Sequence, residues 1–230
     1  MMAVRPCRPS RCFSATTPAT MDAPDLAQIA ALEMRANGLE PMFAPEVLRE
    51  AELWARTGPQ RSGDIRDLRG RQWFSIDNVD TLDLDQLTWA EALVDGSLRL
   101  AVAVADVDAM VHRGSSVDAH AAANTTSVYT AAGVFPMLPP LSSNDHTSLH
   151  EGEERLAVVV EMNVDREGSV SDAQLYRATV CNHAKLNYDS VAAWLEAQAP
   201  PPAAIATNAS LRAQLRLPAV CGNGANSVVR

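Results

Sequence analysis

The chain has 230 residues, with 19 Lys or Arg against 28 Asp or Glu, so its net charge is −9 at pH 7. Hydrophobic residues make up 47% of it, which is enough for one sizeable core. No apolar run approaches the roughly 18 residues of a membrane-spanning helix, so we expect no membrane interaction. The negative charge is unfavourable for binding nucleic acid, because phosphate contacts dominate the affinity of such binding.

The first 20 residues contain Arg5, Arg8 and Arg11, several Ser and Thr, and no acidic residue. This composition is typical of a transit peptide. A disordered extension that precedes a natural start at Met21 explains it more simply, and we favour that interpretation of residues 1–20.

Residues 21–60 are predicted to form a helical N-terminal segment. Apolar residues recur at helical spacing between residues 24 and 56, and Gly38 and Pro41 divide this stretch into two helices. The segment TGPQRSG, residues 57–63, has the composition of a loop.

Residues 61–198 are predicted to form an α/β domain, a mixed sheet with flanking helices. Residues 73–76 are rich in strand-forming side chains, and RLAVAVA at 99–105 is an apolar run of strand length. Residues 199–230 begin with a Pro/Ala-rich stretch, and we expect an irregular surface tail there.

The segment SIDNVDTLDLDQ, residues 75–86, carries the clearest functional signal. Asp77, Asp80, Asp83 and Asp85 lie within nine residues, without one Lys or Arg among them. Carboxylates this close raise one another's pKa unless a cation offsets their charge. A divalent metal bound by oxygen gives that relief, and Mg²⁺ is the usual choice when the substrate brings phosphate oxygens.

Two other interpretations of this segment exist. A calcium loop of the helix–loop–helix type needs a glycine at its sixth position and a glutamate at its twelfth. Counted from Asp77, those positions hold Leu82 and Thr88, so that motif fails. A solvated acidic loop is the second alternative, but the aspartates lie between two predicted buried strands, where idle charge is unfavourable.

The cysteines show no CxxC pair and no framework of disulfide spacing. Unpaired cysteines are typical of a reducing compartment, so we expect a cytoplasmic protein. The four positions are Cys7, Cys12, Cys181 and Cys221.

Four segments in order resemble the catalytic RNB domain of the RNase II and RNase R family, from Ile65 to Gln198. They are SIDNVDTLDLDQ, RLAVAVADVDAMVHRGSSVDAHAAANTTSVY, VFPMLPPLSSNDHTSLHEGEERLAVVVEMNVDREGSV and LYRATVCNHAKLNYDSVAAWL. The resemblance implies a hydrolytic 3′→5′ exoribonuclease that releases nucleoside 5′-monophosphates from single-stranded RNA with Mg²⁺ and water. We expect a monomer with no dedicated protein partner.

The acidic motif of this family is matched residue by residue. Asp77, Asp83 and Asp85 match its first three aspartates, while Gln86 stands where the family has a fourth and Asp80 has no counterpart. The resemblance implies that the first three bind metal directly or through water, and that Asp83 and above all Asp85 are catalytic. Gln86 is a weaker, neutral candidate ligand. We expect the three carboxylates to converge on one Mg²⁺-sized site.

Two tyrosines match RNA-binding positions of the family. Tyr129, in NTTSVYTAAGVFPMLP, matches a tyrosine that stacks on the terminal base, and stacking suits binding without sequence preference. Tyr188, in KLNYDSV, matches a tyrosine beside the RNA sugar, where the 2′-OH distinguishes RNA from DNA. The alternatives are an ordinary core or strand residue for Tyr129 and a helix-start aromatic on the core for Tyr188.

Later family elements, including a catalytic arginine and an OB-type RNA-binding domain, have no counterpart before residue 230. We therefore expect the N-terminal portion of the catalytic domain, with little activity of its own. Two alternatives stay open, a catalytically inactive RNA-binding or interaction fragment and a metal-binding acidic domain unrelated to RNA. Basic residues that remain candidates for phosphate contacts are Arg113, Arg155, Arg177 and Lys185.

Overall fold

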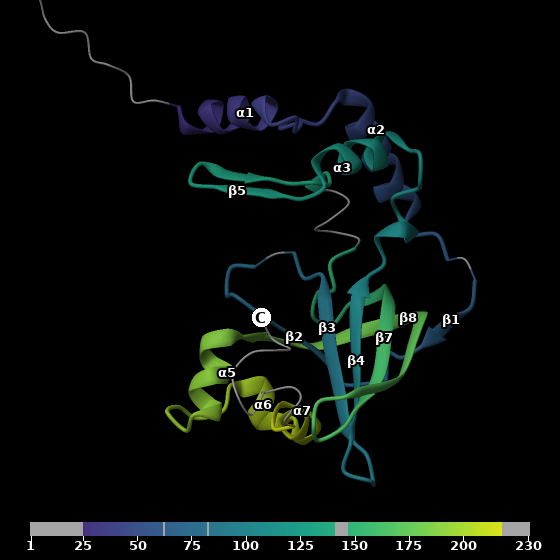
Figure 1. The fold of residues 1–230 in the computed structure, drawn as a ribbon, viewed down its shortest axis with the longest axis vertical. Helices are drawn as coiled ribbons and strands as arrows, with labels where there is room; N and C mark the ends of the chain where they lie inside the picture. Colours follow the sequence, from purple (N-terminus) through teal and green to yellow (C-terminus); the bar gives the residue numbers. More distant parts are fainter. Residues whose placement is uncertain (1–24, 62, 82, 141–146, 218–230) are drawn as a thin grey trace, which may run out of the picture.

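The computed structural model describes residues 25–61, 63–81, 83–140 and 147–217 (Figure 1). The predicted disordered extension at residues 1–20 lies outside the described residues. The helices are α1 Leu26–Ala36, α2 Pro45–Thr57, the 3-10 turn η1 Val107–Ala109, α3 Ser116–Asn124, α5 Tyr188–Leu195, α6 Ala203–Thr207 and α7 Ala209–Leu215. The strands are β1 Ile65–Asp67, β2 Trp73–Asp77, β3 Gln86–Ala92, β4 Leu98–Ala105, β5 Val128–Thr130, β6 Gly133–Phe135, β7 Glu154–Val164 and β8 Val170–Asn187.

The two expected N-terminal helices are observed as α1 and α2. Asp25 caps α1, because its side chain accepts hydrogen bonds from the backbone N–H groups of Ala27 and Gln28. The chain leaves α1 through Gly38, whose φ of 80° suits glycine. Helix α2 then begins with Pro45, which needs no hydrogen-bond partner for its nitrogen in the first turn.

The main sheet closes on itself through its last strand. Its order is β1-β8-β2-β3-β4-β7, and β7 also pairs with β8. Strand β8 is 18 residues long, so its first part pairs antiparallel with β7 and its last part pairs parallel with β2. The predicted mixed sheet with flanking helices is confirmed.

A bulge divides β8 at His183. Trp73 of β2 faces Asn182, whereas the next residue, Phe74, faces Ala184, so β8 carries one extra residue there. Because side chains alternate between the faces of a strand, an extra residue exchanges the faces beyond it. Asn182 therefore lies on the Trp73 side of the sheet, and Ala184 on the Phe74 side.

Two hydrophobic clusters occupy the two faces of the sheet. The first joins the sheet to α5, α6 and α7, through Phe74, Leu100, Leu186, Trp194, Ile205 and Leu215. The second lies on the other face, around Trp73, Leu87, Ala101, Val159 and Val180. A third cluster joins α2 to η1 and α3, through Val47, Trp54, Met110 and Val117, in the part of the molecule above the sheet in Figure 1.

The prediction of an irregular tail from residue 199 was wrong for residues 203–215. These form α6 and α7, and Ile205 and Leu215 are fully buried against the sheet. Helices this short are not stable by intrinsic propensity, so packing against the sheet must stabilise them. Such packing cannot be read from the local sequence pattern. Residues 218–230 lie outside the described residues. None of the described helices has the length and apolarity to span a bilayer.

Candidate functional site

The acidic residues lie between the end of β2 and the start of β3. Asp77 is the last residue of β2, and Gln86 is the first of β3. Between Asp83 and Asp85, Leu84 is only 1% exposed, while both aspartates are exposed. Since neighbouring side chains in an extended segment point to opposite sides, burial of Leu84 turns both carboxylates outward together. This explains the spacing of the two aspartates.

Backbone hydrogen bonds fix this segment. The Leu84 carbonyl accepts a hydrogen bond from the Leu149 N–H at 2.7 Å, and the Asp85 carbonyl accepts one from the Ala105 N–H at 2.9 Å. The Ser148 hydroxyl donates to Asp83 Oδ1 at 3.0 Å. The acidic loop is therefore held by the end of β4 and by the residues that precede β7.

Asp85 lies close enough to Asp83 and to Asp77 for their charges to affect its pKa. Although Asp85 is exposed as a residue, partial burial of its carboxyl raises its pKa, and the charges of Asp83 and Asp77 raise it further. Burial also raises the pKa of Asp77, although a hydrogen bond from Ser75 and the charge of Lys185 oppose this. Repulsion of this kind favours a bound cation.

One carboxylate oxygen of the site has no partner. Asp77 Oδ2 is buried, and it makes no hydrogen bond. A buried oxygen acceptor without a donor is unfavourable in a folded protein. A metal ion or its bound water would satisfy this atom.

The donor atoms fit Mg²⁺ in their chemistry. All are oxygens, from the three carboxylates and the amide of Gln86, and Mg²⁺ prefers oxygen and commonly keeps several waters beside one or two carboxylates. Within the described ranges, no group of three His, Cys, Asp or Glu side chains is already arranged to hold a metal. Convergence of Asp77, Asp83 and Asp85 on one ion therefore stays a prediction, and binding partly through water fits the arrangement best.

Tyr188 lies beside the acidic residues. It is the first residue of α5, directly after Asn187, which pairs with Asp77 across β8 and β2. Burial raises the pKa of the Tyr188 hydroxyl, and the charges of Asp77 and Asp85 raise it further. With 37% of its surface exposed, Tyr188 is accessible to a ligand at the acidic site.

Tyr129 lies in a different part of the molecule. It is the middle residue of β5, which pairs only with β6 among the described strands, and it faces Val134 across this hairpin. The hairpin lies above the sheet, near α1 (Figure 1). Tyr129 is 78% exposed, so a core role is excluded and its ring is free to stack.

Among the predicted phosphate contacts, Lys185 is next to the acidic site. Its ammonium donates to the Thr81 carbonyl at 2.5 Å, and its charge lowers the pKa of Asp77. Arg177 and Arg155 are instead engaged in ion pairs, with Asp106 at 2.6 Å and with Glu153 at 2.8 Å.

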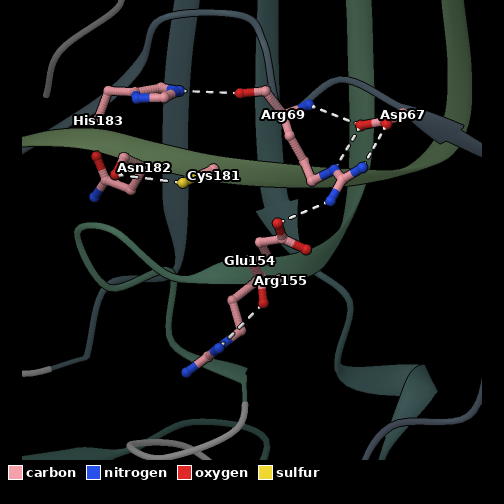
Figure 2. Close-up of polar contacts among 7 residues, drawn as sticks. All are labelled: Asp67, Arg69, Glu154, Arg155, Cys181, Asn182 and His183. Carbon is pink, nitrogen blue, oxygen red and sulfur yellow. Dashed lines mark hydrogen bonds and ion pairs between the residues drawn. The ribbon is translucent and has the colours of Figure 1, made fainter.

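Figure 2 shows polar contacts around the β8 bulge at His183. His183 Nε2 donates to the Arg69 carbonyl at 3.0 Å. The Arg69 guanidinium binds both oxygens of Asp67 and, at 2.8 Å, Glu154 of β7. Through Arg69, the loop between β1 and β2 is thus bound both to the bulge in β8 and to β7.

Sequence reasoning missed two residues that support the site, Ser148 and Asn182. Both are buried and polar, with exposed fractions of 0% and 1%. The only signal was a polar side chain within an apolar strand for Asn182, in RATVCNHA, and none was evident for Ser148. Their role depends on contacts with distant segments.

Comparison with known proteins identifies the family. The model of the RNB domain matches residues 65–221, which extends past Gln198, where the resemblance was expected to end. The chain is 37% identical to Ribonuclease R of Thermotoga maritima over 155 residues, 67% of this chain and 22% of that protein. It is also 37% identical to Exoribonuclease 2 of Escherichia fergusonii over 150 residues, 64% of this chain and 23% of that protein.

Solved structures agree with this result. RNase R of Mycoplasma genitalium in complex with double-stranded RNA superposes with a TM-score of 0.70 and 27% identity, over 84% of this chain and 33% of that one. The protein thus has a mixed α/β fold that matches part of the RNase R structure. It belongs to the RNB family of RNase R and RNase II-type exoribonucleases, and it spans about a fifth of the length of these curated relatives.

The fold alone does not decide activity. Yeast Ssd1, described as a pseudonuclease, has a TM-score of 0.53 with 20% identity, over 68% of this chain and 20% of that one. A protein that shares the fold can therefore lack the chemistry. The residues of the acidic site must decide what this chain does.

Proposed function

We propose that the chain supplies the acidic part of the active site of a Mg²⁺-dependent, hydrolytic 3′→5′ exoribonuclease that releases nucleoside 5′-monophosphates from single-stranded RNA. The observation that carries this proposal is the buried, unpartnered Asp77 Oδ2, together with the charges of Asp83 and Asp77 that act on Asp85. An RNA-binding module without catalysis would gain nothing from repelling carboxylates, which also repel phosphate.

Each residue has a role in this proposal. Asp77, Asp83 and Asp85 would hold Mg²⁺, directly or through water, with Gln86 as a weaker ligand. When bound, the ion would lower the pKa of water and stabilise charge on the phosphate oxygens. Asp85, at the centre of the mutual repulsion, orients the attacking water. Lys185 balances part of the acidic charge.

The tyrosines would bind RNA. Tyr188 lies beside Asp77 and Asp85, where it would contact the sugar of the terminal nucleotide. Exposed Tyr129 offers a ring on which a base can stack. Support for RNA as the ligand comes from the Mycoplasma genitalium RNase R, which has been solved in complex with RNA. We further propose a monomer in the cytoplasm, in keeping with the free thiol of Cys181.

The proposal is tested with the purified chain, 5′-labelled single-stranded RNA and Mg²⁺, beside an EDTA control. We expect Mg²⁺-dependent release of nucleoside 5′-monophosphates, slow because the chain spans only part of its relatives' length. Mn²⁺ binding, followed by electron paramagnetic resonance, gives a second readout. Hydrolysis that persists in EDTA would contradict the metal mechanism.

Asp85→Asn should abolish hydrolysis and weaken Mn²⁺ binding, while RNA binding stays largely intact, because only a metal ligand and its charge are lost. Asp80→Asn is the matched control, since it removes the same charge from an exposed residue of the same loop. RNA binding without metal uptake or hydrolysis in the unmodified chain would favour the inactive RNA-binding alternative.

A further inference from the structure

We propose that Asn182 is a positioning residue that holds the two arms of the acidic site, Asp77 on one side and the Asp83–Asp85 segment on the other, in one arrangement. This inference rests on the proposed function, because it assigns a purpose to that arrangement. Asn182 itself lies behind the site and contacts neither RNA nor the reacting atoms in this role.

The bulge at His183 gives Asn182 its place. Because β8 carries one extra residue there, the Asn182 side chain points to the Trp73 face of the sheet and is 1% exposed. A buried amide must have its hydrogen bonds satisfied. Asn182 Oδ1 accepts from the Ala184 N–H at 3.0 Å, a donor just beyond the bulge.

One chain of hydrogen bonds runs from Asn182 to Asp83. Asn182 Nδ2 donates to the Leu149 carbonyl at 2.9 Å. The N–H of the same Leu149 donates to the Leu84 carbonyl, and its neighbour Ser148 donates to the Asp83 carboxylate. One amide group therefore fixes the short segment that orients both Asp83 and the backbone before Asp85.

A second chain of contacts runs from Asn182 through Ser75 toward Asp77. Asn182 Nδ2 also lies 3.4 Å from Ser75 Oγ, a long hydrogen bond. Ser75 is two residues before Asp77 in β2, on the same face of the strand, and the Ser75 hydroxyl opposes the rise in the pKa of Asp77. When Ser75 Oγ accepts from Asn182, its own proton is left to donate to the carboxylate.

The chemistry of asparagine suits this position. The side chain must accept at one end, from Ala184, and donate at the other, to Leu149 and Ser75. Leucine has a similar size but would leave the Leu149 carbonyl and the Ala184 N–H without partners. Groups that orient metal ligands from behind commonly change metal affinity by about 10–100-fold when they are removed.

The test compares two buried side-chain amides, that of Asn182 in β8 and that of Gln214 in α7. Asn182→Leu removes the proposed positioning group. Gln214→Met is the matched control, because Gln214 is 4% exposed and bridges Ala90 and Gln72 on the opposite face. Both variants should lower the thermal midpoint. We measure Mn²⁺ affinity and the hydrogen exchange of the Leu149 and Ala105 amides in the full chain.

We expect Asn182→Leu to weaken Mn²⁺ binding by about tenfold or more and to speed exchange at Leu149 and Ala105, with Gln214→Met close to the unmodified chain in both. Equal effects of the two variants, or none from Asn182→Leu, would overturn the proposal. If Asn182→Leu does not fold, Asn182→Ser, which reaches fewer partners, is measured in its place against the same criteria.

The two proposals fail in different ways. If the unmodified chain takes up no Mn²⁺, the proposed function fails, and exchange at Leu149 and Ala105 alone decides whether Asn182 holds the loop. If Mn²⁺ binds the unmodified chain and the Asn182 variants with the same affinity, only the positioning role is wrong. Ser148→Ala adds a check, because its effect on affinity should be less than additive with that of Asn182→Ser.

Discussion

Leu84 shows how one apolar residue organises two charged ones. Its burial leaves Asp83 and Asp85 on the same side of the chain, and the charges of Asp83 and Asp77 both act on Asp85. The spacing of the two aspartates therefore acquires its meaning from the burial of Leu84 between them. The two tyrosines differ in this respect, since Tyr188 belongs to the same site and Tyr129 stands on a separate hairpin.

We predict that Tyr129→Ala weakens binding of single-stranded RNA by about 5–150-fold, which corresponds to the roughly 1–3 kcal/mol of one stacked base. The thermal midpoint should hardly change, because the side chain is 78% exposed. Fluorescence anisotropy with a labelled oligonucleotide measures the affinity. Val134→Ala, at the facing position of the hairpin, is the control, and an equal loss there would show that the hairpin rather than the ring matters.

At the scale of elements, the loop after β1 is tied to β7 by charge. The Arg69 side chain hydrogen-bonds Asp67 and lowers its pKa from 3.8 to about 2. Because this pKa is lower in the folded chain than in the unfolded one, ionised Asp67 stabilises the fold above pH 3.8. That contribution is lost as the pH falls from 3.8 through about 2.

We predict that the Asp67 carboxyl stays ionised at about pH 3 in the unmodified chain and becomes largely protonated there in Arg69→Ala, because its pKa then returns toward the ordinary value of 3.8. Carbon-13 NMR of the carboxyl group measures this. Arg155→Ala is the control, since Arg155 pairs with Glu153 instead. An unchanged titration in Arg69→Ala would contradict the ion pair.

Helices α6 and α7 are the elements on which the first core cluster depends. We predict that Leu211→Ala, at a side chain 2% exposed, lowers the free energy of unfolding by about 2–5 kcal/mol. Leu195→Ala, at 40% exposure in the neighbouring α5, should have a much smaller effect. Urea unfolding of both variants measures the difference, and similar values would mean that α7 does not pack as described.

At the scale of the whole molecule, the net charge of −9 and the concentration of acid at one site favour stabilisation by divalent cations. We predict that Mg²⁺ raises the thermal midpoint, because a ligand at about 100 times its Kd stabilises the fold by about 2.7 kcal/mol. NaCl at matched ionic strength controls for general screening. Asp85→Asn should lose most of the Mg²⁺ effect, and an equal rise with NaCl would refute specific binding.

The sequence by itself determined the acidic motif, the family and the mixed α/β class. The aspartates are local in the chain, and alternation around an apolar residue is a property of any extended segment. The strand at 99–105 and the two N-terminal helices follow from local periodicity in the same way.

Only the tertiary structure decided how the site is supported and where the tail packs. Asn182 lies 33 residues from Leu149 and 107 from Ser75, and no local pattern encodes such contacts. The bulge at His183, which buries Asn182, depends on pairing between β2 and β8. Likewise, the sequence alone predicts an irregular tail around Ile205 and Leu215. Short helices owe their stability to packing, so these two side chains become part of the core only when the sheet is in place.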